Sequence, residues 1–139
     1  LIELVSEARY VTSELPGNER YGLLYMDDSL IADNTNLILK LARLNSIERA
    51  DQPRGLRLAA SGRDAWLDIS AETLYEHQSN LEKRLAAARK EAEILEQRLS
   101  SESYVAKAPA ALVDDSRKSL AEKQAAILRL QHELEVLAN

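Results

Sequence analysis

Two long runs with a repeat of 3.5 residues dominate the second half of the chain. In each run the apolar positions are separated alternately by three and four residues, which is the spacing of a coiled coil. Polar residues stand on this stripe at Gln78 in the first run and at Ser116 and Lys123 in the second. The apolar positions are Leu74, Leu81, Leu85, Ala88, Ala92, Leu95 and Leu99, and then Val113, Leu120, Ile127, Leu130, Leu134 and Leu137. The pattern predicts two helical arms, from Ser70 to about Ser100 and from about Pro109 to Leu137.

The segment between the two runs is short. Pro109 has no amide hydrogen and cannot lie inside a continuing helix. We therefore predict an antiparallel helical hairpin that turns near residues 104–108. Equal distances from this turn place Ala88 opposite Lys123, so that a small residue makes room for a long cation. Polar residues at such positions usually fix the register of a coiled coil.

The first 69 residues contain two predicted amphipathic helices. The first ends at the turn signal Pro16-Gly17-Asn18. The second follows Asp27-Asp28-Ser29, which we interpret as a loop that supplies the N-cap. The predicted stripes are Ile2, Val5, Arg9, Thr12 and Leu15 in the first helix, and Ile31, Leu37, Ile38, Leu41 and Leu44 in the second, which runs from Leu30 to Leu44.

Four short apolar segments of the same region predict strands. They are residues 20–26, 46–49, 56–60 and 65–69, with turns at 53–55 and 61–64. A few strands with helices on one face form a small module that can fold alone, if marginally. The predicted fold class is therefore α+β, with a module at residues 1–69 and an antiparallel coiled-coil arm at residues 70–139.

Composition narrows the possible functions. The formal net charge of −5 and the pI near 5.1 argue against bulk attraction to nucleic acid or to an anionic membrane. Charged residues make up 29% and aromatic residues 4% of the chain, which suits solvated helices better than a thick core. The absence of cysteine excludes disulfides and thiol chemistry. No apolar run reaches the ~20 residues of a membrane span, and no signal peptide is visible. The chain begins inside a helical pattern without Met, which indicates a piece of a longer protein.

No motif of a catalytic or metal site is present, so we predict neither catalytic nor metal-binding residues and no enzyme activity for this chain alone. His77 and His132 stand on opposite arms, where solvated or rim positions are expected. The acidic residues 27, 28 and 33 lack the spacing of a calcium loop and are better explained as a loop and a helix cap. Trp66 and Tyr75 could stack on a base, although a lone Trp in a short strand more often packs in a core.

The connection between the arms carries a cluster of cations and one aromatic side chain. These residues are Arg98, Tyr104, Lys107, Arg117 and Lys118. A protruding tip of this kind could bind a folded polyanion through phosphate contacts and stacking. The alternative is a solvated tip, because Glu102, Asp114 and Asp115 dilute the positive charge. The residues alone slightly favour the solvated tip.

The sequence at this connection resembles that of a known family. The run Arg98-Leu-Ser-Ser-Glu-Ser-Tyr-Val-Ala-Lys-Ala-Pro-Ala-Ala-Leu-Val113 is similar to the Lys-Leu-Ser-Asn-x-x-Phe-Val-x-Lys-Ala-Pro-x-x-Val-Val pattern in the C-terminal coiled coil of bacterial valyl-tRNA synthetases. Ser101 stands where Asn is usual, Tyr104 where Phe is usual and Leu112 where Val is usual. The resemblance is strong over residues 98–113.

Weaker similarities extend the resemblance over the rest of the chain. Asp115-Ser-Arg-Lys-Ser-Leu120 resembles the Glu-x-x-Lys-Leu continuation of the family, and Trp66-Leu-Asp-Ile69 resembles the short strand before its first arm. Arg9 with Glu14-Leu-Pro-Gly17 resembles the end of an Arg-x-x-Arg-x-Glu-x-x-x-Pro helix beyond the anticodon-binding bundle. The second Arg of that pattern is absent from residues 10–13.

The resemblance implies a division of labour. The body of these class I enzymes attaches valine to its tRNA with ATP and magnesium, through His-Ile-Gly-His and Lys-Met-Ser-Lys-Ser motifs that this chain lacks. The C-terminal hairpin reaches the outer corner of the tRNA, where the D and T loops meet. The five residues of the cluster thereby become candidates for backbone contacts and stacking on loop bases. The implied partner is valine tRNA, with no cofactor in this chain, no membrane contact, a monomeric state and a cytoplasmic location.

A hypothesis from another class stays open. The arm could be a purely structural coiled coil that dimerises or docks a protein partner. The charged tip and a hairpin closed within one chain favour tRNA binding, whereas the overall acidity favours the structural role.

Overall fold

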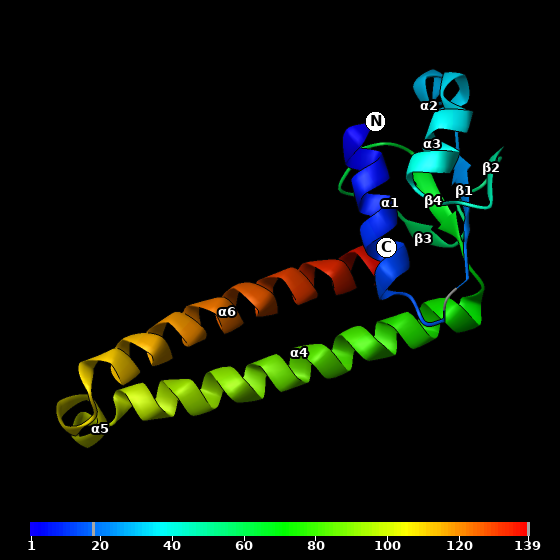
Figure 1. Cartoon of the computed structure of the whole chain (residues 1–139). Helices are drawn as coiled ribbons and strands as arrows, with labels where there is room; N and C mark the ends of the chain where they lie inside the picture. Colours follow the sequence, from blue (N-terminus) through cyan, green and yellow to red (C-terminus); the bar gives the residue numbers. More distant parts are fainter. Residues whose placement is uncertain (18, 139) are drawn as a thin grey trace. The chain divides into compact units, whose positions relative to one another are not determined.

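The structure is a computed structural model that describes residues 1–17 and 19–138 (Figure 1). Asn18, the last residue of the first predicted turn, lies outside the described residues, as does Asn139. The chain divides into two compact units, Leu1–Gln78 and Ser79–Asn139. The long helix α4 (Ala71–Ser100) begins in the first unit and continues into the second. The predicted α+β class is confirmed.

The first unit contains a four-stranded sheet in the order β2-β1-β4-β3. The strands are β1 (Gly22–Tyr25), β2 (Ser46–Arg49), β3 (Leu56–Arg57) and β4 (Ala65–Asp68). β1 pairs in parallel with β2 and antiparallel with β4, and β3 pairs antiparallel with β4. Leu23 lies opposite Leu67, and Leu67 lies opposite Leu56, so the three share one face and are all buried. All four predicted strands are confirmed, although three are shorter than predicted.

Helix α1 (Ile2–Glu14) buries a different face from the predicted one. The buried residues are Leu4 and Ala8, and Leu15, which follows the helix, is buried as well. Ile2, which opens the predicted stripe, is 84% exposed. That stripe would also have buried Arg9 and a hydroxyl, which is costly without partners. The prediction of the helix is confirmed. The predicted face was wrong at Ile2 and Arg9, which are exposed, and right at Leu15, which is buried.

The single helix predicted for residues 30–44 consists of two short helices. They are α2 (Ser29–Asp33) and α3 (Thr35–Leu41). Asn34 interrupts the helix, because its backbone is not helical and its side-chain amide donates to the Leu30 carbonyl at 2.7 Å. Ile38 is fully buried, whereas Leu37 and Leu41, predicted on the same stripe, are 51% and 49% exposed. The break changes which side chains reach the core.

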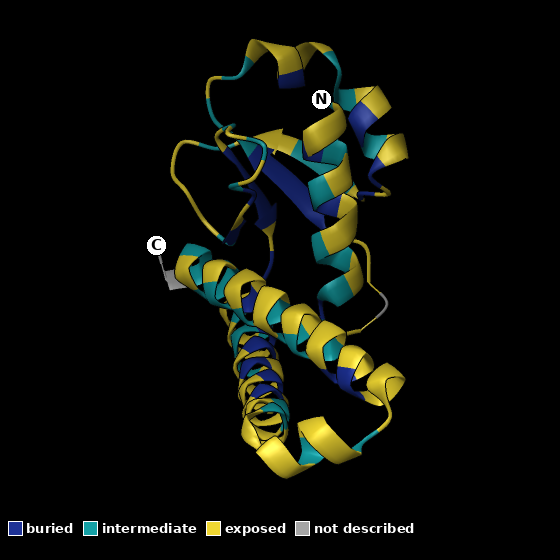
Figure 2. Cartoon of the chain, turned by 90° about the vertical axis from the view of Figure 1, so that its left-hand side faces the viewer, coloured by how far each residue is buried: buried dark blue, intermediate teal, exposed yellow. Residues whose placement is uncertain are grey.

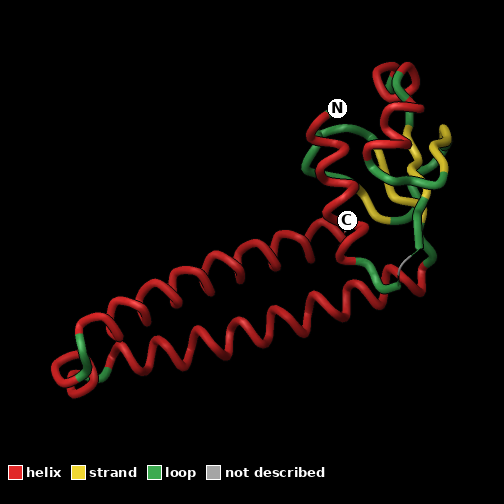
Figure 3. The backbone as a smooth tube through the Cα atoms, viewed as in Figure 1, coloured by secondary structure: helices red, strands yellow, loops and turns green. Residues whose placement is uncertain are grey.

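The second unit is a helical hairpin. Helix α4 and helix α6 (Ala110–Ala138) run antiparallel, and the short helix α5 (Glu102–Lys107) lies between them at the closed end (Figure 3). The buried positions follow facing stripes on the two long helices (Figure 2), which together we call the seam. A cluster on the seam contains Leu81, Leu85, Ala88 and Leu130, with Ile127, Leu134 and Leu137 packed against it.

This cluster agrees with the predicted hairpin. The seam of each helix coincides with the predicted stripe, including its polar positions: Ser116 is buried and Lys123 is half-buried. The Lys123 ammonium forms an ion pair with the Glu91 carboxylate, one turn from Ala88. The predicted turn near residues 104–108, in contrast, is a third helix.

Candidate nucleic-acid interface

Helix α5 begins and ends where its sequence dictates. The Ser101 hydroxyl accepts a hydrogen bond from the Tyr104 amide at 3.3 Å, which caps the first turn. Asn, the usual residue of the family pattern at position 101, is an equally good cap. Ala108 is extended, as expected of a residue before a proline, and Pro109 begins the approach to α6. Capping and proline chemistry therefore explain the Ser-x-x-Tyr and Lys-Ala-Pro parts of the motif.

Two contacts involve the Tyr104 side chain, which is half-buried. Its hydroxyl lies 3.1 Å from the hydroxyl of Ser116 on α6. The guanidinium of Arg98, from the last turn of α4, lies over its ring with 5.8 Å between the guanidinium carbon and the ring centroid. The structure thus brings the last turn of α4 and the second turn of α6 together at this aromatic side chain of α5.

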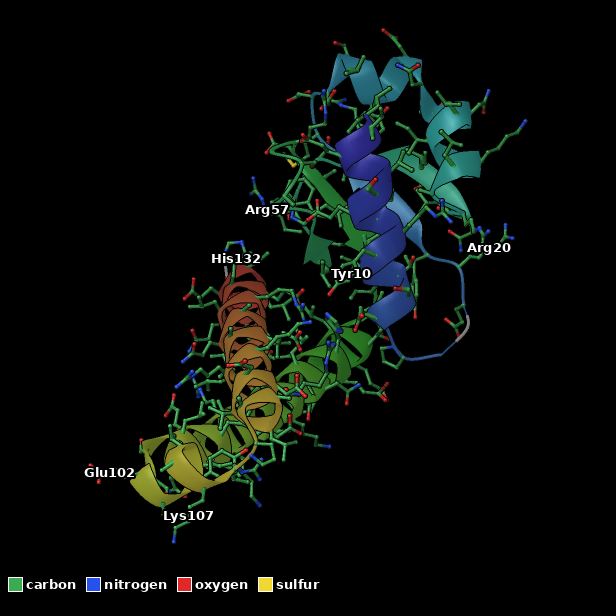
Figure 4. All side chains as sticks on the ribbon, turned by 60° about the vertical axis from the view of Figure 1, so that its left-hand side comes forward. Tyr10, Arg20, Arg57, Glu102, Lys107 and His132 are labelled. Carbon is green, nitrogen blue, oxygen red and sulfur yellow. The ribbon has the colours of Figure 1, made fainter. Side chains whose placement is uncertain are left out.

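The other predicted cations lie at the surface of the same end. Lys107 is exposed in the last turn of α5 and points away from the three helices (Figure 4). Lys118 is exposed on α6. Arg117 forms a loose ion pair with Asp114, with 3.8 Å between nitrogen and oxygen and both side chains more than 60% exposed. Such a pair contributes little to stability and can exchange its partner.

The charge of this end differs from that of the whole chain. Residues 98–118, which we call the tip, contain four cations and three carboxylates, whereas the chain has a formal net charge of −5. All three carboxylates are exposed. The tip is therefore slightly positive, and its charges are solvated and accessible.

Sequence reasoning missed three residues of the tip. Val105 and Leu112 are 37% and 52% exposed, so the tip presents apolar surface beside its cations. Ser116 was interpreted only as a polar residue of the coiled-coil stripe, and its contact with Tyr104 spans 12 residues. Val105 and Leu112 were visible in the tip motif as a signal of a contact surface, because a tip that only meets water would carry polar residues there.

A polar depression in the first unit has a different character. It is lined mainly by Asp27, Asp28, Asp64 and Arg63. Arg63 pairs with Asp28 at 2.8 Å, and the other two carboxylates pair with Arg49 and Arg57. Burial alone would raise the pKa of Asp28, but the hydrogen bonds from Arg63 and the Ile31 amide lower it below its usual value. Asp28 caps α2, as predicted, so this cluster stabilises a loop.

The histidines and aromatic residues outside the tip are placed as follows. His132 is exposed, as predicted, but His77 is only 6% exposed, so the prediction of a solvated or rim position was wrong for this residue. Sequence spacing alone did not reveal which residues cover this position of α4. Trp66 is buried with Arg57 over its ring, which confirms the packing role, and Tyr75 is 74% exposed.

No group of three or more His, Asp or Glu side chains within residues 1–17 and 19–138 is arranged to hold a metal ion. None of the helices in these ranges combines the length and apolar character that crossing a membrane requires.

Comparisons with known proteins agree with the tip motif. Residues 74–138 match the family model described as the valyl-tRNA synthetase tRNA-binding arm. A valine–tRNA ligase of Streptomyces avermitilis is 33% identical over 121 residues, which cover 86% of this chain and 14% of that protein. A valine–tRNA ligase of Caulobacter vibrioides is 28% identical over an alignment that covers all of this chain and 16% of that protein. The chain thus spans about a sixth of the length of these relatives.

The family match and the structure cover the same segment. Residues 74–138 contain nearly all of α4 together with α5 and α6. The relatives extend the similarity through the first unit as well. The hairpin of this chain therefore belongs to the family of valyl-tRNA synthetase tRNA-binding arms, and the resemblance seen at the tip motif is confirmed.

Proposed function

We propose that this chain is the C-terminal tRNA-binding appendage of a valine–tRNA ligase. Its arm contacts the outer corner of the tRNA, where the D and T loops meet, and so orients and tightens the complex for aminoacylation. The observation that carries the proposal is the tip: its accessible cations lie at the closed end of a hairpin that matches a tRNA-binding family. A polyanion would bind there rather than to the acidic remainder of the chain.

Each tip residue has a distinct part in this proposal. Lys107 and Lys118 contact phosphates as exposed point charges. Arg117 exchanges its loose pair with Asp114 for a phosphate. Arg98 stays over the Tyr104 ring and donates hydrogen bonds from its N–H groups to the phosphate backbone of the tRNA. Tyr104 contributes the aromatic surface on which a loop base can stack. These contacts give affinity and orientation, whereas the choice of tRNA belongs to other domains.

The proposal assigns no chemistry to this chain. Activation of valine with ATP and magnesium belongs to the class I catalytic body of the complete enzyme. Residues 1–69 form a module at the end of the anticodon-binding region, and residues 70–139 form the arm. We propose that the complete enzyme is cytoplasmic. We also propose that it acts as a monomer, because α6 of the same chain already covers the seam of α4. The covered seam also weighs against a structural coiled coil that needs a second chain to bury its apolar stripe.

The test is a titration of the 139-residue chain against valine tRNA at low and moderate salt. The main variant combines Arg98→Ala, Lys107→Ala and Lys118→Ala. We expect its affinity to fall by about tenfold or more, and the slope of log K against log salt to become shallower by about two units, because phosphate contacts release counterions.

A matched control keeps the charge change but moves it away from the tip. It combines Lys83→Ala, Arg89→Ala and Lys90→Ala, which are exposed cations of α4. We expect it to bind within about threefold of the parent, since long-range effects are screened by salt. Equal losses in both variants would mean that net charge, and not the tip, determines binding. A parent chain without affinity in either salt would contradict the proposal for this fragment.

A further inference from the structure

Helix α5 is too short to hold its own direction. It has six residues, and isolated helices below ~12 residues are marginal in water. None of its residues is fully buried. Its orientation must therefore come from a few contacts with the long helices on either side.

One polar contact links α5 to α6. Within the part of the chain that the structure describes, the bond between the Tyr104 and Ser116 hydroxyls is the single side-chain hydrogen bond between these helices. Ser116 is only 7% exposed and lies on the seam between α4 and α6, so packing restricts its position. The guanidinium of Arg98 from α4 lies over the ring of Tyr104.

We infer that Tyr104 and Ser116 form a latch that sets the direction of α5, and that Ser116 is thereby a positioning residue for tRNA binding. Lys107 follows Tyr104 by three residues, which is less than one helical turn. Fixing the ring therefore fixes the side from which the Lys107 ammonium projects. The latch itself is independent of tRNA, but its consequence for binding rests on the function proposed above.

The two hydroxyls are not equivalent when one is removed. Ser116→Ala removes the protein partner of the Tyr104 hydroxyl, and the half-buried ring must then turn toward solvent for this hydroxyl to bond to water. Tyr104→Phe leaves the Ser116 hydroxyl, which can turn to the carbonyl of Leu112 four residues earlier in the same helix. Removing both hydroxyls leaves an apolar pair, and such paired removal is often nearly neutral.

The experiment combines a readout without tRNA and a readout with it. Hydrogen exchange of the Val105 and Ala108 amides reports α5 directly, because these amides donate to the carbonyls of Ser101 and Tyr104. Affinity for valine tRNA and its salt slope report binding. The variants are Ser116→Ala, Tyr104→Phe, the double variant, and Lys107→Ala as the contact-residue control.

We expect Ser116→Ala to accelerate exchange of the two amides and to weaken binding by about three- to tenfold, with an unchanged salt slope. Tyr104→Phe and the double variant should have smaller effects than Ser116→Ala, because neither leaves the Tyr104 hydroxyl without a partner, but both lack the bond and should still accelerate exchange of the two amides. Lys107→Ala should leave exchange unchanged and make the slope shallower by about one unit.

Other results would overturn the inference in distinguishable ways. If exchange of Val105 and Ala108 in Ser116→Ala equals that of the parent, the latch does not hold α5. If exchange accelerates while the affinity stays the same, the direction of α5 does not position the contact. If the parent itself does not bind tRNA, the proposed function fails for this chain, and the exchange data still decide whether the latch exists.

Discussion

The two units bury their apolar side chains in different ways. In the first unit, elements far apart in the sequence meet around a sheet and leave six large side chains with less than 2% exposure: Leu4, Leu23, Ile31, Ile38, Leu58 and Leu67. In the second unit, one seam joins two helices, and Leu81 alone among the described residues meets the same limit. Alanines and polar residues fill much of that seam. When a side chain is truncated in a core that is closed on all sides, its neighbours cannot move in to fill the cavity, whereas the neighbours along a seam one side chain deep can do so.

The largest expected difference comes from truncating one leucine in each unit. Leu23→Ala should cost about 3–4 kcal/mol and Leu130→Ala about 2 kcal/mol, because the cost of a cavity depends on how far the site relaxes. Denaturation can be followed by fluorescence of Trp66, the one tryptophan, which lies in β4 of the first unit, and by ellipticity at the helical band.

The matched control for the seam is Leu128→Ala, which changes the same residue type on the same helix. Leu128 is 68% exposed, so its loss should stay within about 0.5 kcal/mol. Equal costs for Leu23→Ala and Leu130→Ala would show that the seam is packed as rigidly as the core, and the distinction between the units would be lost.

The dependence of stability on pH is a second property in which the first unit should differ from the second. The lowered pKa of Asp28 means that the folded state prefers the carboxylate, so its stabilisation is complete above the unfolded pKa of about 3.9 and is lost as pH falls through the lower folded pKa. Asp28→Asn should therefore cost about 1–2 kcal/mol at pH 7 and progressively less as the pH falls below the unfolded pKa. Trp66 fluorescence measured from pH 7 to pH 2 tests this.

Asp27→Asn is the control for the acid prediction. Asp27 pairs with Arg49, but the two side chains are 81% and 61% exposed, so the loss should stay within about 0.5 kcal/mol at every pH. A constant cost for Asp28→Asn across the pH range would mean that the cap geometry, and not the charge, stabilises the loop.

The same contrast explains what the sequence could predict. The seam was predictable because a helix repeats locally and each arm packs on one partner, so even the polar positions fell where the stripe placed them. In the first unit, the buried face of α1 depended on packing, and the stripe at Ile2 was as regular as the correct one. The break at Asn34 depended on a side-chain hydrogen bond to the Leu30 carbonyl, which hydrophobic spacing does not reveal. The burial of His77 likewise followed from packing, and not from spacing.

The tip lies between these two cases. Its motif and its five candidate residues could be found from the sequence because caps, prolines and charges are local signals. The contact between Tyr104 and Ser116 could not, because it depends on α5, which was predicted as a turn. Without helix α5, no feature of the sequence indicated that the side chain of Tyr104 contacts α6. The contact roles of the candidate residues stay predictions for the tRNA titration.

The smallest expected effect concerns the ion pair between Lys123 and Glu91. The two side chains are 41% and 53% exposed, so water competes for both charges and the pair should contribute at most about 0.5 kcal/mol. Glu91→Gln should therefore be nearly neutral, as should its control Glu93→Gln on the same helix. A double-mutant cycle of Glu91→Gln with Lys123→Met isolates the coupling. A coupling above about 1 kcal/mol would mean that this pair stabilises the seam more than an exposed ion pair ordinarily does. The hairpin would then depend on charge as well as on its leucines, and its stability would fall with added salt.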